Sequence, residues 1–542
     1  MQGRSDDQRE LLDVESVAGH LLKPGSVFAF LAVHRTRLFP PELFTDLFPS
    51  GRGRPSVPPE VVATVLVLQA LHGLSDREAV EALTFDLRWK AACGLAITDT
   101  AFDPSTLTYW RRRLAGSERP NRIFETVAEV IAQIGAVTGK TRRALDSTIL
   151  DDAVARQDTV TQLIAAIRRV AREIPAGAEM VTAVTSSGHD YAQPGKPQIA
   201  WDDPQARDEL VSALVNDALA VLTEIEARHP GAEGLDEKAV QAVALLALVA
   251  GQDVEPAEGS DGTDGRWRIA TTVAPDRMIS TVDPDTRHAH KSRERRQDGF
   301  KAHVVVEPDT GLITNTGLTR AAGPANSDAT VGVALLAADP SLAGPGPGPG
   351  PGPGPGPAAE QVEVLADSAY ASGDALAAIE VAGHRAVIKP WPLRPAVAGG
   401  FTLDDFTHDP AAGTVTCPNG HTRPVARTGH VSFKSLCRGC PLRERCTTAA
   451  AGRTLKLGSH HALQRAHRAR ATSPEHLEAY RRHRPMVERS IAWLTHGNRR
   501  VPHRGVTKNN AWLHTRVAAL NLRRLLRLGL HLDHGSWALA SV

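Results

Sequence analysis

Three acidic residues that lie far apart in the chain constrain its fold. Two of them lie in segments with the pattern of a strand, and the third lies in a segment with the pattern of a helix. Asp146 lies in the apolar run 142–150 and Asp367 in the apolar run 362–370, and both runs are typical of short strands with the aspartate at or near the strand end. Glu488 lies in a long, arginine-rich segment with helical spacing. Two strands and a late helix that bring these acids to one point require an α/β fold, which is the fold class we predict.

Carboxylate side chains grouped in this way have a defined chemistry. Carboxylate oxygens are the ligands that hard divalent cations prefer. A pair of such cations can stabilise both the attacking and the leaving oxygen of an in-line displacement at phosphorus. The three acids therefore indicate a candidate metal site, provided that the fold brings them together.

The charge of the chain is balanced overall but unevenly distributed. Lys plus Arg (62) nearly equals Asp plus Glu (61), so the net charge of +1 predicts no partner. Residues 202–264 carry fifteen acidic and three basic side chains, whereas residues 481–527 carry twelve Lys or Arg and one acid, Glu488. A basic stripe of this density indicates binding to a polyanion, because each neutralised phosphate releases counterions. The alternative is a solvated basic helix.

Two arginines of the basic stripe stand next to the third acid. Arg484 lies four residues before Glu488 and shares its helix face, and Arg481 lies about one turn further back. We predict that both arginines contact nucleic acid beside the carboxylate. Taken alone, the pattern is more typical of an ordinary surface ion pair.

No segment has the character of a membrane anchor. No apolar stretch reaches the roughly 18 to 20 residues of a membrane span, and the first residues lack the apolar centre of a signal peptide. We expect a soluble cytoplasmic protein, associated with the nucleoid and without a membrane partner. In such a compartment the five cysteines are expected to stay reduced.

The length of 542 residues requires several structural units. We predict a helical DNA-binding domain at 1–135, the first part of the α/β core at 136–158, an acidic helical insertion at 159–265, the continued core at 266–399, a cysteine-rich insertion at 400–456, and core helices with a basic C-terminal region at 457–542. Seven Gly-Pro repeats at 344–357 predict an exposed linker, because every second residue lacks a backbone donor.

The order of elements in the core restricts its topology. We expect strands at 279–283, 299–306, 312–316 and 385–389, and helices near 328–338, 373, 461–470 and 474–495. The second and third of these strands form a predicted β-hairpin around the turn at 307–311. A ribonuclease-H-like α/β fold requires the order strand, hairpin, helix, strand and helix, followed by a late helix. In this chain the late helix carries the third acid.

A second constellation consists of four cysteines within thirty residues of one another: Cys417, Cys437, Cys440 and Cys446. The spacing Cys437-x2-Cys440 is that of a zinc knuckle, and the other two thiols can complete a tetrahedral site of four cysteines. We predict a structural Zn²⁺ ion here, with His421 as the reserve ligand. Unmetallated reduced thiols and a redox role are the alternatives. The isolated Cys93 lies in an apolar helix and is expected in the core.

Further candidate DNA contacts come from three segments. Arg111 and Arg112 lie on an aromatic and basic helix at the end of the N-terminal domain, which suits DNA binding of the helix-turn-helix kind. Lys301 and His303 alternate to one face of a strand expected beside that of Asp146, and could approach a phosphate there. Arg287 belongs to a basic loop that could follow the DNA backbone. The alternatives are an ordinary helical domain, solvent-facing strand residues and a solvated loop.

Several short motifs together resemble a known family. The stretches at 144–148, 283–287, 298–303, 365–370 and 484–488 resemble, in this order, the motifs of a bacterial insertion-sequence transposase of the DDE class. The similarity is to the group numbered eleven eighty-two in insertion-sequence nomenclature, near the IS-four type. It extends over nearly the whole chain, including the helical N-terminal domain and the cysteine insertion.

The resemblance implies a function for the three acids. Asp146, Asp367 and Glu488 would bind two Mg²⁺ ions, or Mn²⁺, and the chain would cut the ends of a mobile element and join the freed 3′ hydroxyl to target DNA. Its partners would be double-stranded DNA, comprising the terminal inverted repeats and the target, and a second copy of the chain or more. Two alternatives are a ribonuclease-H-like nuclease that cuts without joining, and a DNA-binding protein descended from a transposase that has lost catalysis.

The last helix departs from the family pattern. Related enzymes carry Tyr, Arg, Glu and Lys on this helix, and Arg484 fits the position four residues before Glu488. Arg481 stands where the tyrosine is expected, while Tyr480 is shifted by one residue, and Thr495 occupies the place of the distal base. Contacts assigned to the tyrosine and the distal base are therefore expected to differ in this chain.

Overall fold

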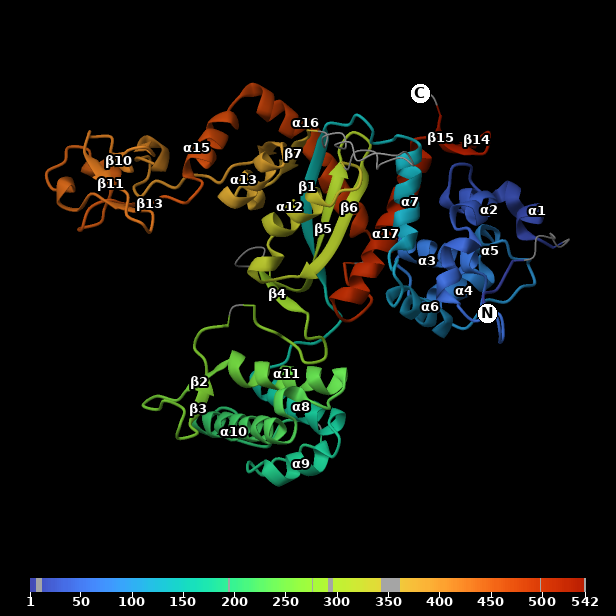
Figure 1. Ribbon diagram of the computed structural model, residues 1–542, viewed down its shortest axis with the longest axis horizontal. Helices are drawn as coiled ribbons and strands as arrows, with labels where there is room; N and C mark the ends of the chain where they lie inside the picture. The colour runs from blue at the N-terminus through green and yellow to red at the C-terminus, as the bar shows by residue number, and fades with distance from the viewer. Residues whose placement is uncertain are drawn as a thin grey trace, which may run out of the picture.

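The structure is a computed structural model, in which residues 1–5, 12–193, 195–274, 276–290, 296–342, 361–497 and 499–540 are described. The predicted Gly-Pro linker at 344–357 lies outside these residues. Figure 1 shows a central sheet with helices on both faces, a helical lobe below it and a small module at one side.

The central sheet has six strands and is built around β1. The strands are β1 (Arg142–Asp151), β4 (Arg287–His290), β5 (Arg296–Glu307), β6 (Leu312–Arg320), β7 (Glu363–Ala366) and β8 (Arg385–Ile388). Their order is β4-β5-β1-β7-β8, and β6 also pairs with β5, on the side away from β1. The β5–β6 hairpin confirms the predicted one. β1 pairs antiparallel with β5 and parallel with β7, so it connects the two halves of the sheet.

The register of β1 and β5 decides which side chains share a face. Asp146 pairs with Val304, and Ser147 pairs with His303. Directly paired residues point to the same face of a sheet, and successive residues point to opposite faces. Asp146 therefore lies on one face of the sheet, whereas Ser147 and His303 lie on the other.

Helices cover both faces of the sheet. On the face of Asp146, α16 (Pro474–Leu494) packs against β1 and α17 (Val506–Arg527) packs against β6. On the other face lie α12 (Asp328–Ala337) and α13 (Gly373–Val381). Each face has its own apolar cluster, and burying such side chains is the main driving force for folding. Two helical layers thus hold the sheet from both sides (Figure 1).

The N-terminal helices pack onto α17. They are α1 (Val14–Ala18), α2 (Val27–Leu38), α3 (Pro59–His72), α4 (Asp76–Phe85), α5 (Leu87–Cys93), α6 (Ser105–Ala115) and α7 (Arg122–Gln133). Their buried residues belong to the same apolar cluster as those of α16, α17 and one face of the sheet. The predicted helical region therefore shares a core with the sheet. Cys93 is buried in this core, as expected.

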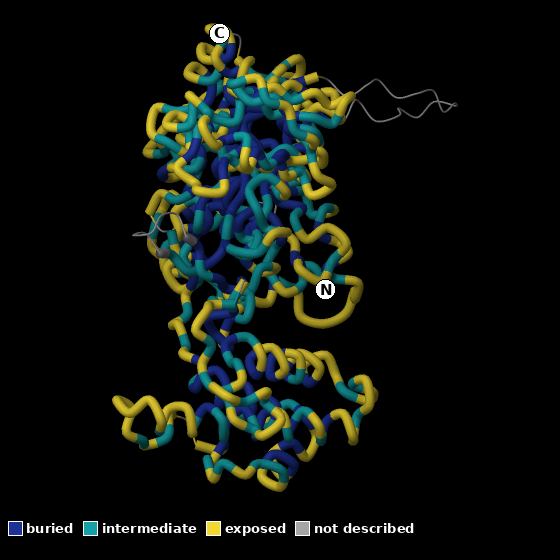
Figure 2. Tube along the Cα trace, turned by 90° about the vertical axis from the view of Figure 1, so that its left-hand side faces the viewer, coloured by how far each residue is buried: buried dark blue, intermediate teal, exposed yellow. Residues whose placement is uncertain are grey.

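A separate helical lobe is inserted after β1. It contains α8 (Thr159–Glu173), α9 (Gly177–Val184), α10 (Pro204–Arg228), α11 (Glu237–Gln252) and the hairpin β2 (Val254–Pro256) and β3 (Trp267–Ile269). The helices enclose an apolar cluster of their own. Figure 2 shows this second buried centre below the main body.

The segment after the lobe differs from the prediction. We expected a strand at 279–283, but these residues do not form one. The side chain of Gln157 accepts a hydrogen bond from the backbone N–H of Thr281 (2.7 Å), and the backbone N–H of Gln157 donates to the carbonyl of Ile279 (2.9 Å). These bonds satisfy the backbone in place of a neighbouring strand.

The cysteine-rich segment forms a small module of short elements. They are β9 (Thr407–Asp409), β10 (Thr414–Thr416), β11 (Thr422–Pro424), β12 (His430–Ser432), α14 (Arg443–Cys446) and β13 (Thr454–Lys456). The chain then enters α15 (His461–Arg470) and α16. A hairpin of β14 (Leu530–Asp533) and β15 (Ser536–Leu539) follows α17. Among the described residues, no helix is long and apolar enough to span a membrane.

A buried arginine fixes the end of α16. Arg516 on α17 is 2 % exposed, and it donates hydrogen bonds to the carbonyls of Leu494 (2.7 Å) and His496 (2.8 Å), and to that of Ala70 on α3. The last carbonyls of a helix have no partners within the helix, so these bonds satisfy groups that would otherwise be buried unpaired. Burial lowers the pKa of Arg516 to about 10.

We predict that Arg516→Met destabilises the protein. The substitution leaves two buried carbonyls and one partly buried carbonyl without a donor, and we expect a loss of about 3 kcal/mol, seen as a lower urea midpoint. The exposed Arg112 provides the control, since Arg112→Met should change the free energy of unfolding by less than about 0.5 kcal/mol. Equal midpoints for the two variants would contradict the role given to Arg516.

Candidate functional site

An arginine on α16 binds the first acid. Arg484 donates from Nη2 to Asp146 Oδ2 (2.8 Å) and from Nη1 to the backbone carbonyl of Leu145 (2.6 Å). The side chains of Arg484 and Asp146 are only 6 % and 15 % exposed. A charged pair in such a place is held more firmly than one in water, because solvent screens it less. The contact brings α16 against β1 beside Asp146.

The pairing of the parallel strands β1 and β7 brings Asp367 toward Asp146. Ala144 of β1 pairs with Leu365 of β7, and Asp146 and Asp367 each follow two residues later. Asp367 comes directly after β7, as predicted, and its Oδ1 accepts a hydrogen bond from the N–H of Ala369 (2.9 Å). Asp146 lies within β1 rather than at its end, because β1 continues along β5 to Asp151. The two aspartates thus lie on neighbouring strands at the same level.

The third acid acts on the first electrostatically. Burial raises the pKa of Asp146, Arg484 and the N–H of Ser147 lower it, and the negative charges of Asp367 and Glu488 raise it further. A charge acts in this way only over short distances in a protein. Glu488 lies one turn after Arg484 on α16, with an exposed side chain. Because Arg484 binds Asp146, α16 carries Glu488 to the face of the sheet on which Asp146 lies.

Tyr480 joins this group, although its sequence position is shifted from the family pattern. Tyr480, Arg484 and Glu488 are spaced by four residues and share one face of α16. Burial raises the pKa of Tyr480, Arg484 lowers it, and the charges of Asp367 and Glu488 raise it. Arg481, at the expected tyrosine position, is exposed to solvent. Helical periodicity applied to Tyr480 would have identified it from the sequence.

The acids have the right chemistry for a hard cation. Carboxylate oxygens suit Mg²⁺ and Mn²⁺, and the charges of Asp367 and Glu488 add to that of Asp146 here. In the described part of the chain, no group of three or more His, Cys, Asp or Glu side chains already has the arrangement of a metal-ion site.

Lys301 and His303 lie on the opposite face of the sheet from Asp146. Lys301 Nζ lies 3.2 Å from Asp328 Oδ1, and Ser147 Oγ donates to the same oxygen (2.6 Å). His303 is 1 % exposed, and burial lowers its pKa to about 4, so the ring is neutral near pH 7. Its Nε2 lies 3.1 Å from Thr319 Oγ1. This placement argues against the predicted contact of these side chains with a phosphate beside Asp146.

The sequence interpretation missed two residues in this region. Asp328 lies in the first turn of α12, after the N-cap Ser327, and joins α12 to the sheet through Ser147 and Lys301. Tyr370 is 1 % exposed, its pKa is raised by burial and then by Asp328, Asp146 and Asp367, and its hydroxyl has no hydrogen-bond partner among the described residues. The sequence signal for Asp328 was the pair Ser327-Asp328, which is typical of the start of a helix.

Three other predicted DNA contacts have different surroundings. Arg287 is 3 % exposed and bonds Asp276 (2.9 Å), so its guanidinium is not offered to DNA. Arg111 forms an ion pair with Asp76 (2.5 Å) that joins α6 to α4. Arg112 is exposed and keeps the position that a DNA contact requires. The burial of Arg287 and the ion pair of Arg111 could not be read from their charge alone.

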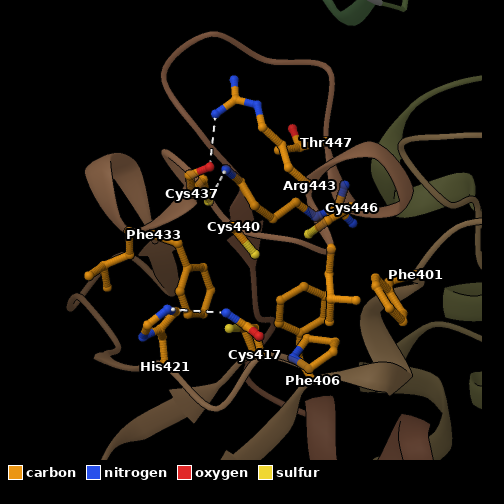
Figure 3. Close-up of a pocket in the computed structure, with 15 residues that line it drawn as sticks. Phe401, Phe406, Cys417, His421, Phe433, Cys437, Cys440, Arg443, Cys446 and Thr447 are labelled. Atoms are coloured by element: carbon orange, nitrogen blue, oxygen red, sulfur yellow. Dashed lines mark hydrogen bonds between the residues drawn. The ribbon is translucent and has the colours of Figure 1, made fainter.

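The four predicted zinc ligands line one small cavity. Figure 3 shows the thiols of Cys417, Cys437, Cys440 and Cys446 around it, together with the imidazole of His421. All four cysteines are free thiols. Burial raises the pKa of Cys446, Arg453 lowers it, and the other three cysteines raise it. The fold therefore brings together thiols that are up to thirty residues apart.

Comparison with known proteins gives two matches. The model of a family described as "Transposase DDE domain" matches residues 416–526, which include Glu488, and that of a "Transposase domain (DUF772)" matches residues 28–113. No curated protein and no solved structure matches the chain. The two matches support a DDE-type insertion-sequence transposase, and at a general level the DDE domain implies an enzyme of phosphoryl transfer on nucleic acid.

Proposed function

We propose that the protein is a DNA transposase that cuts the ends of a mobile element and joins the freed 3′ hydroxyl to target DNA. The observation that carries the proposal is the contact of Arg484 with Asp146, which holds the helix of Glu488 against β1, while Asp367 follows the neighbouring parallel strand β7. Two transposase-domain matches, one toward each end of the chain, support it.

The sheet topology supports a ribonuclease-H-like core. Strands β6, β5 and β1 are antiparallel, β7 and β8 continue parallel to β1, and α12, α13 and α16 follow β6, β7 and β8 in the chain. Such a core presents acids from its central strands and from a late helix at one site. The N-terminal helices and the helical lobe are then additions to this core.

We propose that Asp146, Asp367 and Glu488 hold two Mg²⁺ ions, or Mn²⁺, since DDE transposases generally use divalent metal ions. When bound, the ions lower the pKa of water and stabilise charge on the phosphate oxygens. Arg484 orients the Asp146 carboxylate, and the exposed Arg481 and Arg112 offer charge to the DNA backbone. Double-stranded DNA is the proposed partner, and joining two ends calls for at least two copies of the chain.

Strand transfer distinguishes a transposase from a nuclease. We expect the purified full chain, with Mg²⁺ or Mn²⁺ and DNA that carries both element ends, to yield joined products that can be separated by gel electrophoresis. Cleaved but unjoined ends would favour the nuclease. DNA binding without cleavage would favour a DNA-binding protein that has lost catalysis.

We predict that Asp146→Asn removes cleavage and leaves DNA binding intact. An amide binds a divalent cation less well than a carboxylate, so the rate should fall about a thousandfold or more. Asp151 lies on the same strand, where its Oδ1 accepts a hydrogen bond from Gln297 Nε2 (2.9 Å), and Asp151→Asn is the matched control. A similar loss in both variants, or none in Asp146→Asn, would contradict the assignment.

Arg484→Gln should slow cleavage and change its pH dependence. Without the guanidinium, Asp146 loses its anchor to α16, and we expect a loss of about 10- to 100-fold at saturating metal. Arg484 lowers the pKa of Asp146, so its removal raises that pKa, and the acid limb of the pH–rate profile should move to higher pH.

The exposed Arg489 on the same helix supplies the comparison for this change. Arg489→Gln removes the same charge without touching Asp146, so its profile should keep the acid limb of the unmodified protein. A shift of equal size in both variants would mean that the net charge of α16, and not the contact between Arg484 and Asp146, sets the pH dependence.

A further inference from the structure

We propose that Cys417, Cys437, Cys440 and Cys446 bind one structural zinc ion, which folds the module of residues 400–457 and fixes it against α15. This site is separate from the three acids. The proposal does not depend on the proposed function, and its failure would leave that function unaffected.

Two tight turns present three of the thiols to one another. In the turn after β10, the N–H of Cys417 donates to the carbonyl of His421 (2.9 Å), and Gly420 has a φ of +79°. In the second turn, Gly439 stands between Cys437 and Cys440 with a φ of +71°. Glycine adopts these conformations without steric cost. Short loops of this kind bring thiols spaced two residues apart onto a single metal ion.

The four thiols line one small cavity. Its volume is about 20 Å³, enough for one small occupant, and all four cysteines line it (Figure 3). Among the described residues, no group of His, Cys, Asp or Glu side chains has the arrangement of a metal-ion site, so the four thiols are not at the spacing of metal ligands in this structure. Three of the four cysteines are only partly buried.

Two arginines lie beside the cysteines. The guanidinium of Arg443 bonds the Cys437 carbonyl (3.1 Å), and the backbone N–H of Arg453 donates to Cys437 Sγ (3.4 Å). Arg443 and Arg453 both line the cavity. Hydrogen bonds around a ligand and its backbone help to orient it toward a metal ion.

The module has little else to stabilise it. Its apolar cluster contains only seven buried residues, and one of these is Cys437 itself. The strands β9 to β13 have three residues each. So small a core leaves a domain marginal, and small domains of this kind commonly depend on a metal ion for folding. A zinc ion would supply the missing stabilisation.

The module connects directly to the helices of the site. Arg468 on α15 binds both carboxylate oxygens of Asp404 (2.7 and 2.6 Å), and Arg465 donates to the carbonyl of Phe406 (2.8 Å). After α15, the chain passes at once into α16, which carries Glu488. The metal-bound module would therefore act as a platform that holds the start of these helices.

The test is the zinc content of the full-length protein. After growth with added zinc and dialysis without chelator, mass spectrometry should find about one zinc ion per chain. Cys440→Ser and Cys446→Ser should lower the content at least about tenfold, whereas Cys93→Ala, which changes a buried thiol of the N-terminal core, should keep it. Zinc-free wild-type protein, or equal content in all variants, would overturn the proposal.

A second measurement on the wild type covers variants that fail to fold. Zinc replaced by Co²⁺ should give the absorption bands of tetrahedral cobalt and the charge-transfer band of thiolate ligands. A spectrum without these bands would overturn the site. His421→Ala should leave the zinc content unchanged. If this variant lost its zinc, the assignment of four cysteine ligands would be replaced by one that includes the imidazole of His421.

Discussion

The contact between Arg484 and β1 determines how the rest of the site is arranged. One guanidinium holds both the carboxylate of Asp146 and the carbonyl before it, so the strand and α16 are fixed at one point. Because Glu488 follows one turn later on the same helix face, this point also sets the position of the third acid. The positive charge of the Arg484 guanidinium partly offsets the negative charge of the three carboxylates. It thereby permits their approach in a partly buried place.

The sheet separates two groups of charged side chains. Asp146, Arg484 and Glu488 occupy one face with α16, and Asp328, Lys301 and Ser147 occupy the other with α12. The second group ties α12 to the back of the strand that carries Asp146. The carboxylate of Asp146 is thus supported from one side by Arg484 and from the other by a strand held in register. At its far end, α16 is fixed by Arg516, which also reaches the N-terminal helices.

The sequence predicted much of this arrangement and left out the parts that depend on tertiary contacts. The hairpin of β5 and β6, the strand before Asp367 and the helices α12, α15 and α16 follow from local periodicity, and the structure confirms them. The strand expected at 279–283 did not form, because Gln157, more than a hundred residues earlier, satisfies its backbone. The faces of Lys301 and His303 depend on the register with β1, which no local pattern encodes. The burial of Arg287 depends in the same way on Asp276.

The helical lobe between β1 and β4 enters and leaves at one end of the sheet. Gln162 and Gln252 hold the carbonyl of Met278 where the chain returns, and the apolar interior of the lobe is complete without the sheet. A unit with its own interior, attached through a pair of adjoining connections, can be exchanged or lost without altering the strand pairing beside it. The lobe is therefore a unit whose sequence can change independently of that of the sheet.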